Sequence, residues 1–149
     1  MSLCLSCGLC CDGTMFHAAP ITEEEAARLE GRVRLSAART NLLQGCSALE
    51  GCSCRVYEDR PATCRVFKCL MLASLEEGII DEAEAREGIG EVMKRRAEVA
   101  RLMGLEDPRR ALELAREEAA AGTASVELTN ALQRLKQMTL LLMLKPAKK

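Results

Sequence analysis

The nine cysteines are the residues of this chain best suited to do chemistry, and all of them lie between Cys4 and Cys69. The first four form a C-x2-C-x2-C-C run, and the others follow in a second block. Thiolates bind zinc and iron well because they are soft, charged donors. Eight of the nine are therefore predicted to be metal ligands, and Cys52 is treated as a spare or as a substitute ligand: Cys4, Cys7, Cys10, Cys11, Cys46, Cys54, Cys64 and Cys69.

The spacing of the first run limits how its sulfurs can be used. A C-x2-C step lets two sulfurs reach the same metal from one tight turn, and the third cysteine repeats that step. Cys10 and Cys11 are adjacent, and neighbouring side chains of an extended segment point to opposite sides. We expect them to serve different metals or opposite sides of one cluster. Eight thiolates then form two four-sulfur sites, or one cluster with ligands to spare.

Disulfides are the main alternative use of so many thiols. The segment from Met1 to Cys11 has neither the basic nor the apolar region of a secretory signal, so a reducing, cytoplasmic location is expected. An odd number of cysteines would also leave one unpaired. Metal ligation is thus favoured over disulfide bonds. His17, the single histidine, is expected to be a polar loop residue and not a ligand.

Cationic and aromatic residues lie between the cysteines of the second block. Two four-thiolate zinc sites, or two oxidised [4Fe-4S] clusters, would carry a charge of about −4 together. Arg60 and Arg65 are predicted to donate hydrogen bonds to sulfur or to offset this charge, and Tyr57 and Phe67 are predicted to shield the site.

Composition and charge exclude several other functions. The net charge is −1, with 21 basic and 22 acidic residues, which gives no reason to expect a nucleic-acid partner. The longest apolar stretch, Met138 to Leu144, is too short to cross a bilayer. Gly88-Ile-Gly90 lacks a preceding strand and is not expected to bind phosphate. No nucleophile–base pair is visible, so no catalytic residue is assigned.

The predicted fold is mainly α-helical, with a cysteine-rich lobe of irregular loops and short helices (residues 1–70) packed on an antiparallel helical bundle (residues 71–149). In the lobe, a capping box at Thr22 and Glu25 opens a helix that ends at Gly31, and a second short helix is expected over Leu35–Leu43. Residues Cys46–Cys69 read as loop. Beyond them, Ser74 with Glu77 suggests a capping box.

Three longer helices are expected in the second half of the chain. An apolar stripe from Ile89 to Met103 ends at Gly104, Asp107 and Pro108 open a helix that Gly122 closes, and a last helix spans about Ala124–Leu144. The stripe of that last helix comprises Leu128, Leu132, Leu135 and Leu142.

The two cysteine blocks together resemble a known family. The run Cys4-Leu-Ser-Cys7-Gly-Leu-Cys10-Cys11, followed by Cys46 and then by Cys54-Arg-Val-Tyr57-Glu-Asp-Arg60-Pro61-Ala-Thr-Cys64-Arg65-Val-Phe67-Lys-Cys69, is similar to the CxxCxxCC family of zinc- or iron-chelating proteins. The resemblance covers about the first half of the chain. It implies metal or iron–sulfur binding by the eight matching cysteines, and Cys52 lies outside its pattern.

Three functions remain open at this point. The first is a metal-binding protein with one or two zinc or iron centres, which are structural at least in part. The second is an iron–sulfur enzyme or electron carrier with a 4Fe-4S cluster, since a relative, flagellin lysine N-methylase, carries a similar cysteine module. The third is a metal-delivery or interaction protein whose helical half docks a protein partner; the sequence does not identify one.

Overall fold

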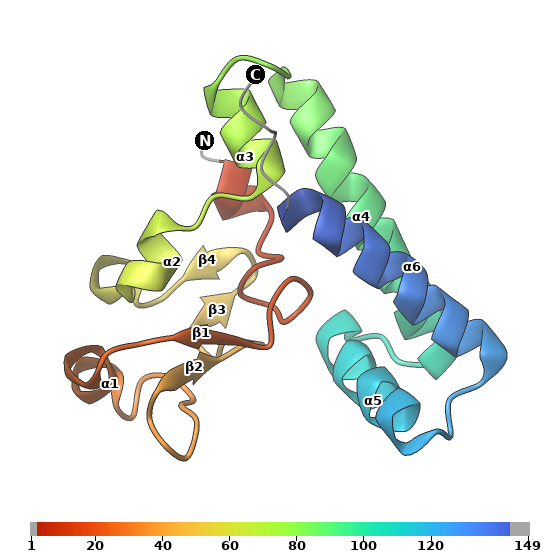
Figure 1. Ribbon diagram of the computed structural model, residues 1–149, viewed down its shortest axis with the longest axis horizontal. Helices are drawn as coiled ribbons and strands as arrows, with labels where there is room; N and C mark the ends of the chain where they lie inside the picture. Colours follow the sequence, from red (N-terminus) through yellow and green to blue (C-terminus); the bar gives the residue numbers. More distant parts are fainter. Residues whose placement is uncertain (1–2, 144–149) are drawn as a thin grey trace. The chain divides into compact units, whose positions relative to one another are not determined.

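The computed structural model describes residues 3–143 of the 149-residue chain. The chain divides into two compact units, Met1–Phe67 and Lys68–Lys149. The fold is mainly helical, as predicted, with six α-helices and a few short strands among the described residues (Figure 1). All of the strands lie in the first unit, where the sequence indicated only loops and short helices.

The first unit is built on two small antiparallel ladders. Strand β1 (Ala18–Pro20) pairs with β2 (Asn41–Leu43), with Ala19 opposite Leu42. Strand β3 (Leu49–Glu50) pairs with β4 (Ser53–Cys54) across the two-residue loop of Gly51 and Cys52. Gly51 has a φ of 59°, the positive value that tight hairpin turns need at their first central position. The cysteine-rich unit therefore has a regular β framework, although no strand exceeds three residues.

Helix α1 (Glu23–Leu29) forms where the capping box predicted it. The Thr22 hydroxyl accepts from the Glu25 N–H, and the Glu25 carboxylate accepts from the Thr22 N–H, so two otherwise unpaired donors are satisfied. The helix predicted over Leu35–Leu43 is wrong. Asn41–Leu43 is β2, and Leu35 forms an isolated bridge with Leu42. Pairing with β1, which is distant in sequence, overrides the weak local helical pattern.

The second cysteine block also contains short elements in place of a plain loop. After the β3–β4 hairpin come a 3-10 turn, η2 (Tyr57–Asp59), and helix α2 (Ala62–Val66), which carries Cys64. At the other end of the unit, the 3-10 turn η1 (Leu3–Ser6) carries Cys4. Residues such as Leu29, Leu42, Ala48 and Val56 form the core beneath these elements.

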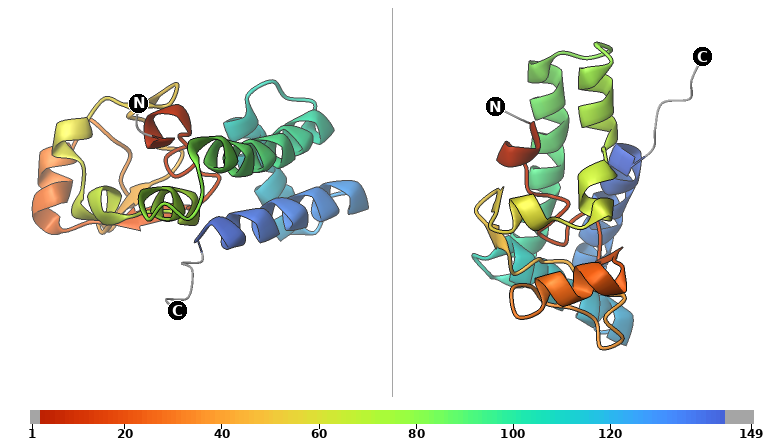
Figure 2. Two further views of the ribbon diagram at one scale, coloured as in Figure 1. Left: turned by 90° about the horizontal axis from the view of Figure 1, so that it is seen from above. Right: turned by 90° about the vertical axis from the view of Figure 1, so that its left-hand side faces the viewer.

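The second unit contains α3 (Leu70–Glu76), α4 (Glu82–Met103), α5 (Pro108–Ala121) and α6 (Val126–Met143). Helix α4 packs against α3, α5 and α6, and it runs beside α6 (Figures 1 and 2). The predicted helix ends at Gly104 and Gly122 are confirmed, as both glycines adopt the left-handed conformation. The Asp107–Pro108 start is confirmed as well, because the Asp107 carboxylate accepts from the Arg109 N–H.

Two predicted helix boundaries in this unit differ from the structure. Ser74 does not cap a helix; it is buried inside α3, and Glu77 follows the last helical residue. Helix α4 instead starts at a capping box made by Asp81 and Glu84. The last helix has the predicted face, with Leu128, Leu135 and Leu142 buried, but Leu144 lies outside the described residues. Among the described helices, none combines the length and apolar character needed to cross a bilayer.

Two glycines inside α4 provide a matched stability test. A Cβ added at Gly90 meets nothing within 4 Å, so Gly90→Ala should stabilise the helical unit by about 0.5–1 kcal/mol through reduced chain entropy. At Gly88 the same Cβ would lie 2.7 Å from the Met71 sulfur, so Met71 must move and Gly88→Ala should gain less. Urea unfolding followed by far-ultraviolet circular dichroism measures both, and equal gains would contradict the contact with Met71.

Candidate metal centre

The first cysteine run and the second block meet in the first unit through a backbone hydrogen bond. The Cys46 N–H donates to the Cys11 carbonyl over 2.6 Å. Beside this contact, a Cβ on Gly13 would lie 3.1 Å from the backbone nitrogen of Gly45, and Gly13 has a φ of 90°. Only glycine fits such a close approach without strain. The two segments, about 35 positions apart along the chain, are thus locked together at the residues that carry the thiols.

Four of the predicted ligands share one core. Cys46 is buried with 7% of its surface exposed, and Cys11, Cys54 and Cys64 pack against the apolar cluster to which it belongs. Cys11 comes from the first run, Cys46 from the loop before β3, Cys54 from strand β4 and Cys64 from helix α2. All four are thiols and not disulfides. This set is called the core quartet below.

The four thiols are close enough to affect one another's ionisation. Burial, followed in order by the charges of Cys46, Cys64, Cys54 and Cys4, raises the pKa of Cys11 to about 12. Burial likewise raises the pKa of Cys64 to about 11, again with contributions from Cys46 and Cys54. Without a cation Cys11 and Cys64 are therefore protonated at neutral pH, and a bound metal ion would have to displace these protons.

Cys46 already has groups that favour a thiolate. Burial raises its pKa, but a backbone hydrogen bond from Ala48 and the charges of Arg55 and Arg34 act in the opposite direction. The charge of Arg60 acts in the same way on Cys64. Soft donors with N–H and cationic neighbours suit zinc or iron. Among residues 3–143, however, no three His, Cys, Asp or Glu side chains stand in metal-binding geometry, so the thiols would have to close around an ion.

The remaining predicted ligands lie outside this core. Cys4 is exposed on η1, and Cys7 and Cys10 are half-buried in the loop that follows. Cys69 directly precedes α3 in the second unit. Cys52, outside the predicted set, is half-buried in the β3–β4 loop. His17 is exposed.

The two predicted arginines bond to backbone carbonyls. Arg60 donates through Nε to the Tyr57 carbonyl over 2.9 Å, and its guanidinium lies 3.5 Å above the Tyr57 ring. Arg65 donates to the carbonyls of Arg60 and Glu58. Arg60 therefore acts on the thiols through its charge, whereas Arg65 fixes the backbone of the turn before α2. Of the predicted shielding residues, Tyr57 is 43% exposed, and Phe67 packs edge-on against Phe16 with ring centroids 4.8 Å apart.

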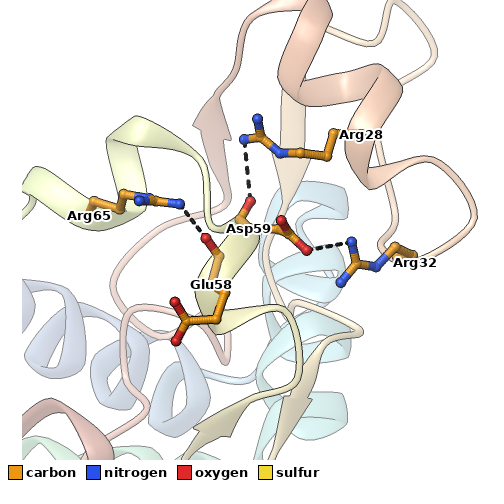
Figure 3. Close-up of polar contacts among 5 residues, drawn as sticks. All are labelled: Arg28, Arg32, Glu58, Asp59 and Arg65. Carbon is orange, nitrogen blue, oxygen red and sulfur yellow. Dashed lines mark hydrogen bonds and ion pairs between the residues drawn. The ribbon is translucent and has the colours of Figure 1, made fainter.

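A polar network around η2 was not foreseen from the sequence. Arg32 pairs with the Asp59 carboxylate at 2.7 Å, and Arg28, from α1, donates to the Asp59 carbonyl over 3.4 Å (Figure 3). Together with the bond from Arg65 to Glu58, these contacts connect α1, η2 and α2. No local pattern marks Asp59 for this role, because its partners come from other segments.

Glu25 positions the helix that carries Cys64. Besides capping α1, its carboxylate accepts from the Ala62 N–H, the first donor of α2, over 2.7 Å. The Thr63 hydroxyl adds a second tie by donating to the Pro20 carbonyl over 2.8 Å. The bond from Ala62 is the main reason that the pKa of Glu25 is lowered, so the ionised carboxylate stabilises the fold.

Removing the Glu25 carboxylate should loosen α2. Glu25→Ala leaves the N–H groups of Thr22 and Ala62 without acceptors and should cost about 1–2 kcal/mol of stability in the first unit. Urea unfolding at neutral pH, followed by the fluorescence of Tyr57, measures this loss. Glu24→Ala, on the exposed side of α1, is the control. Equal midpoints for the two variants would contradict the role of Glu25.

The raised thiol pKa values give the metal-free protein a definite pH dependence. Unfolded thiols ionise near 9.0, whereas Cys64 and Cys11 ionise near 11 and 12 in the fold. The folded state thus holds more protons above pH 9, and its stability should fall as the pH rises from there. Urea unfolding in the presence of a chelator, followed by NMR signals of the buried Leu9 and Leu29 methyl groups, measures the fall. Cys11→Ala should show a smaller fall, and a flat wild-type midpoint would contradict the shifts.

Comparison with known proteins agrees with a metal-chelating function. Searches of curated proteins and of solved structures find no match to the chain. A family model, CxxCxxCC, described as a "Putative zinc- or iron-chelating domain", matches residues 3–88. The match covers more than half of the chain and includes every cysteine. The chain belongs to the CxxCxxCC family of zinc- or iron-chelating domains.

Proposed function

We propose that this protein binds zinc or iron through cysteine thiolates, with Cys11, Cys46, Cys54 and Cys64 as the ligands of one centre. The observation that carries the proposal is the gathering of these four thiols, from four separate segments, in one core of the first unit. Four thiolates complete a tetrahedral zinc site. The family description, a zinc- or iron-chelating domain, supports the same chemistry.

The electrostatics of the core quartet support a cationic ligand. Thiolates in this core are expensive to desolvate and repel one another, which is why the pKa values of Cys11, Cys46 and Cys64 are raised. Arg34, Arg55 and Arg60 offset only part of that charge. A divalent ion would supply the rest and release the thiol protons, so binding tightens as the pH rises.

Cys4, Cys7, Cys10 and Cys69 match the family pattern but do not belong to the core quartet. One or two centres, held by cysteines of the family pattern in a cytoplasmic protein, make up the full proposal. The charge of Cys4 reaches Cys11, so the first run and the quartet influence each other. This proximity favours the competing form of the site, a 4Fe-4S cluster that draws ligands from both sets.

Substitution of one quartet thiol tests the proposal. Cys54→Ser should lower the bound metal by one ion per chain and should also destabilise the first unit, because metal binding is coupled to folding by on the order of 10 kcal/mol per zinc. Elemental analysis of purified protein and Tyr57 fluorescence during unfolding measure the two effects. Ser53→Ala, which changes the exposed neighbour on the same strand, should retain both metal and stability.

Retention of metal and stability by Cys54→Ser would overturn the proposed centre. The identity of the metal is decided by anaerobic purification. A brown protein with broad absorbance near ~400 nm and stoichiometric sulfide contains an iron–sulfur cluster, whereas zinc sites are colourless.

A further inference from the structure

Cys52, which lies outside the family's cysteine pattern, packs against the first cysteine run. A Cβ built on Gly8 would lie 3.6 Å from the Cys52 Cα and 3.7 Å from its Sγ, both ordinary van der Waals contacts. Gly8 follows Cys7 directly and precedes Cys10 by two positions. The Cys52 side chain therefore faces the backbone between these two thiols.

The backbone of the first run curls around that same glycine. The N–H groups of Cys7 and Gly8 donate to the Cys4 carbonyl over 3.2 and 3.4 Å. The N–H groups of Cys11 and Asp12 donate to the Gly8 carbonyl over 3.0 Å each. Gly8 joins the two turns with a φ of 70°, a value that glycine adopts without strain. Cys4, Cys7 and Cys10 thus lie on two consecutive turns centred on Gly8, the residue that Cys52 contacts.

Cys52 lies within reach of the same metal ion as this run. Consecutive Cα atoms are about 3.8 Å apart, which places the Cα atoms of Cys7 and Cys52 within about 9 Å of each other. Two cysteine side chains span such a gap when both sulfurs bind one ion at about 2.3 Å. The β3–β4 hairpin fixes the position of Cys52, since the ladder pairs Glu50 with Ser53 on either side of its loop.

The core quartet leaves this run one thiol short of a four-sulfur site. Cys11 belongs to the quartet, so the run itself supplies three sulfurs, and Cys52 is not part of the apolar cluster that holds the quartet. Its thiol is half-buried, which leaves it open to an ion at the surface of the unit. Among the thiols of the first unit, Cys52 is the one that remains for the fourth position.

We infer that Cys52 is a metal ligand and completes a second zinc- or iron-binding site with Cys4, Cys7 and Cys10. The inference rests on the proposed function, since it requires metal binding by thiolates in this unit. It places two complete four-thiolate sites in residues Met1–Phe67. The hairpin then has two roles, because Cys54 on its strand serves the quartet and Cys52 in its loop serves the second site.

Zinc titration of the reduced, metal-free full-length chain tests the inference. Wild-type protein should bind two Zn²⁺, and Cys52→Ser should bind one, with the circular dichroism spectrum retained. Ser53→Ala, the matched control on the same hairpin, should bind two. Two ions bound by Cys52→Ser would overturn the inference, and loss of an ion in Cys69→Ser together with two ions in Cys52→Ser would overturn it in favour of Cys69.

A measurement on the unaltered chain covers the case in which Cys52→Ser fails to fold. Alkylation followed by mass spectrometry should modify Cys52 at least about tenfold more slowly with Zn²⁺ bound than without it, since a metal-bound thiolate is shielded. Equal rates would overturn the inference. Suppose that Cys54→Ser loses an ion, that Cys52→Ser still binds two ions, and that Zn²⁺ does not change the alkylation rate of Cys52. The proposed function then stands, and only the role of Cys52 fails. If wild-type protein binds no metal, both fail.

Discussion

The first unit depends on one constraint, which is that four thiols share a small core. Cys46 is buried there, and Cys11, Cys54 and Cys64 pack against the same apolar side chains. As neutral thiols they behave as small hydrophobic groups and contribute to packing. As thiolates they repel one another across a poorly solvated space, as the raised pKa of Cys11 shows. Under the proposed function the same residues would be core without a cation and ligands with one.

The polar contacts of the unit hold the segments that carry these thiols. The bond from Cys46 to Cys11 joins the first run to the second block, and the Glu25 carboxylate joins α1 to the start of α2. The ion pair of Arg32 with Asp59 adds η2 to the same assembly (Figure 3). This ion pair is largely exposed and contributes little energy alone. Its effect is geometric, because each contact restricts the position of a thiol-bearing segment.

The elements that could be predicted from the sequence are those determined by residues close together in the chain. The capping box at Thr22, the Asp107–Pro108 start and the ends at Gly104 and Gly122 act within one turn, and all are found in the structure. The strands were missed because their stability comes from partners far along the chain. The segment Leu35–Leu43 shows this, since its pairing with β1 spans more than twenty residues. The capping box predicted at Ser74 was wrong because the same residue pattern can occur inside a helix, where Ser74 is buried.

The candidate site was readable from the sequence in its chemistry but not in its grouping. Residue types and spacing predict thiolate ligands, yet they do not indicate which thiols meet. The separation of Cys10 from Cys11 illustrates the difficulty. Because they are adjacent, their side chains were expected to point to opposite sides. In the fold Cys11 packs on the core cluster, whereas Cys10 is not among the members of that cluster. The turn centred on Gly8 produces this division, and no spacing rule includes Cys52, which approaches that turn from the hairpin.

The division at Cys10 and Cys11 also bears on which centre organises the unit. A site at the core quartet draws on four segments, so filling it closes loops of the chain that are long in sequence. A site at the first run would take three sulfurs from seven consecutive residues, Cys4 to Cys10. Hydrogen bonds to the carbonyls of Cys4 and Gly8 already hold this segment in turns. Loop-closure entropy grows with the separation of the joined residues, so the quartet gains more stability for the fold from each metal bond. The first run is already curled in the fold, whereas the proposed centre at the quartet would couple metal binding to the folding of the whole unit.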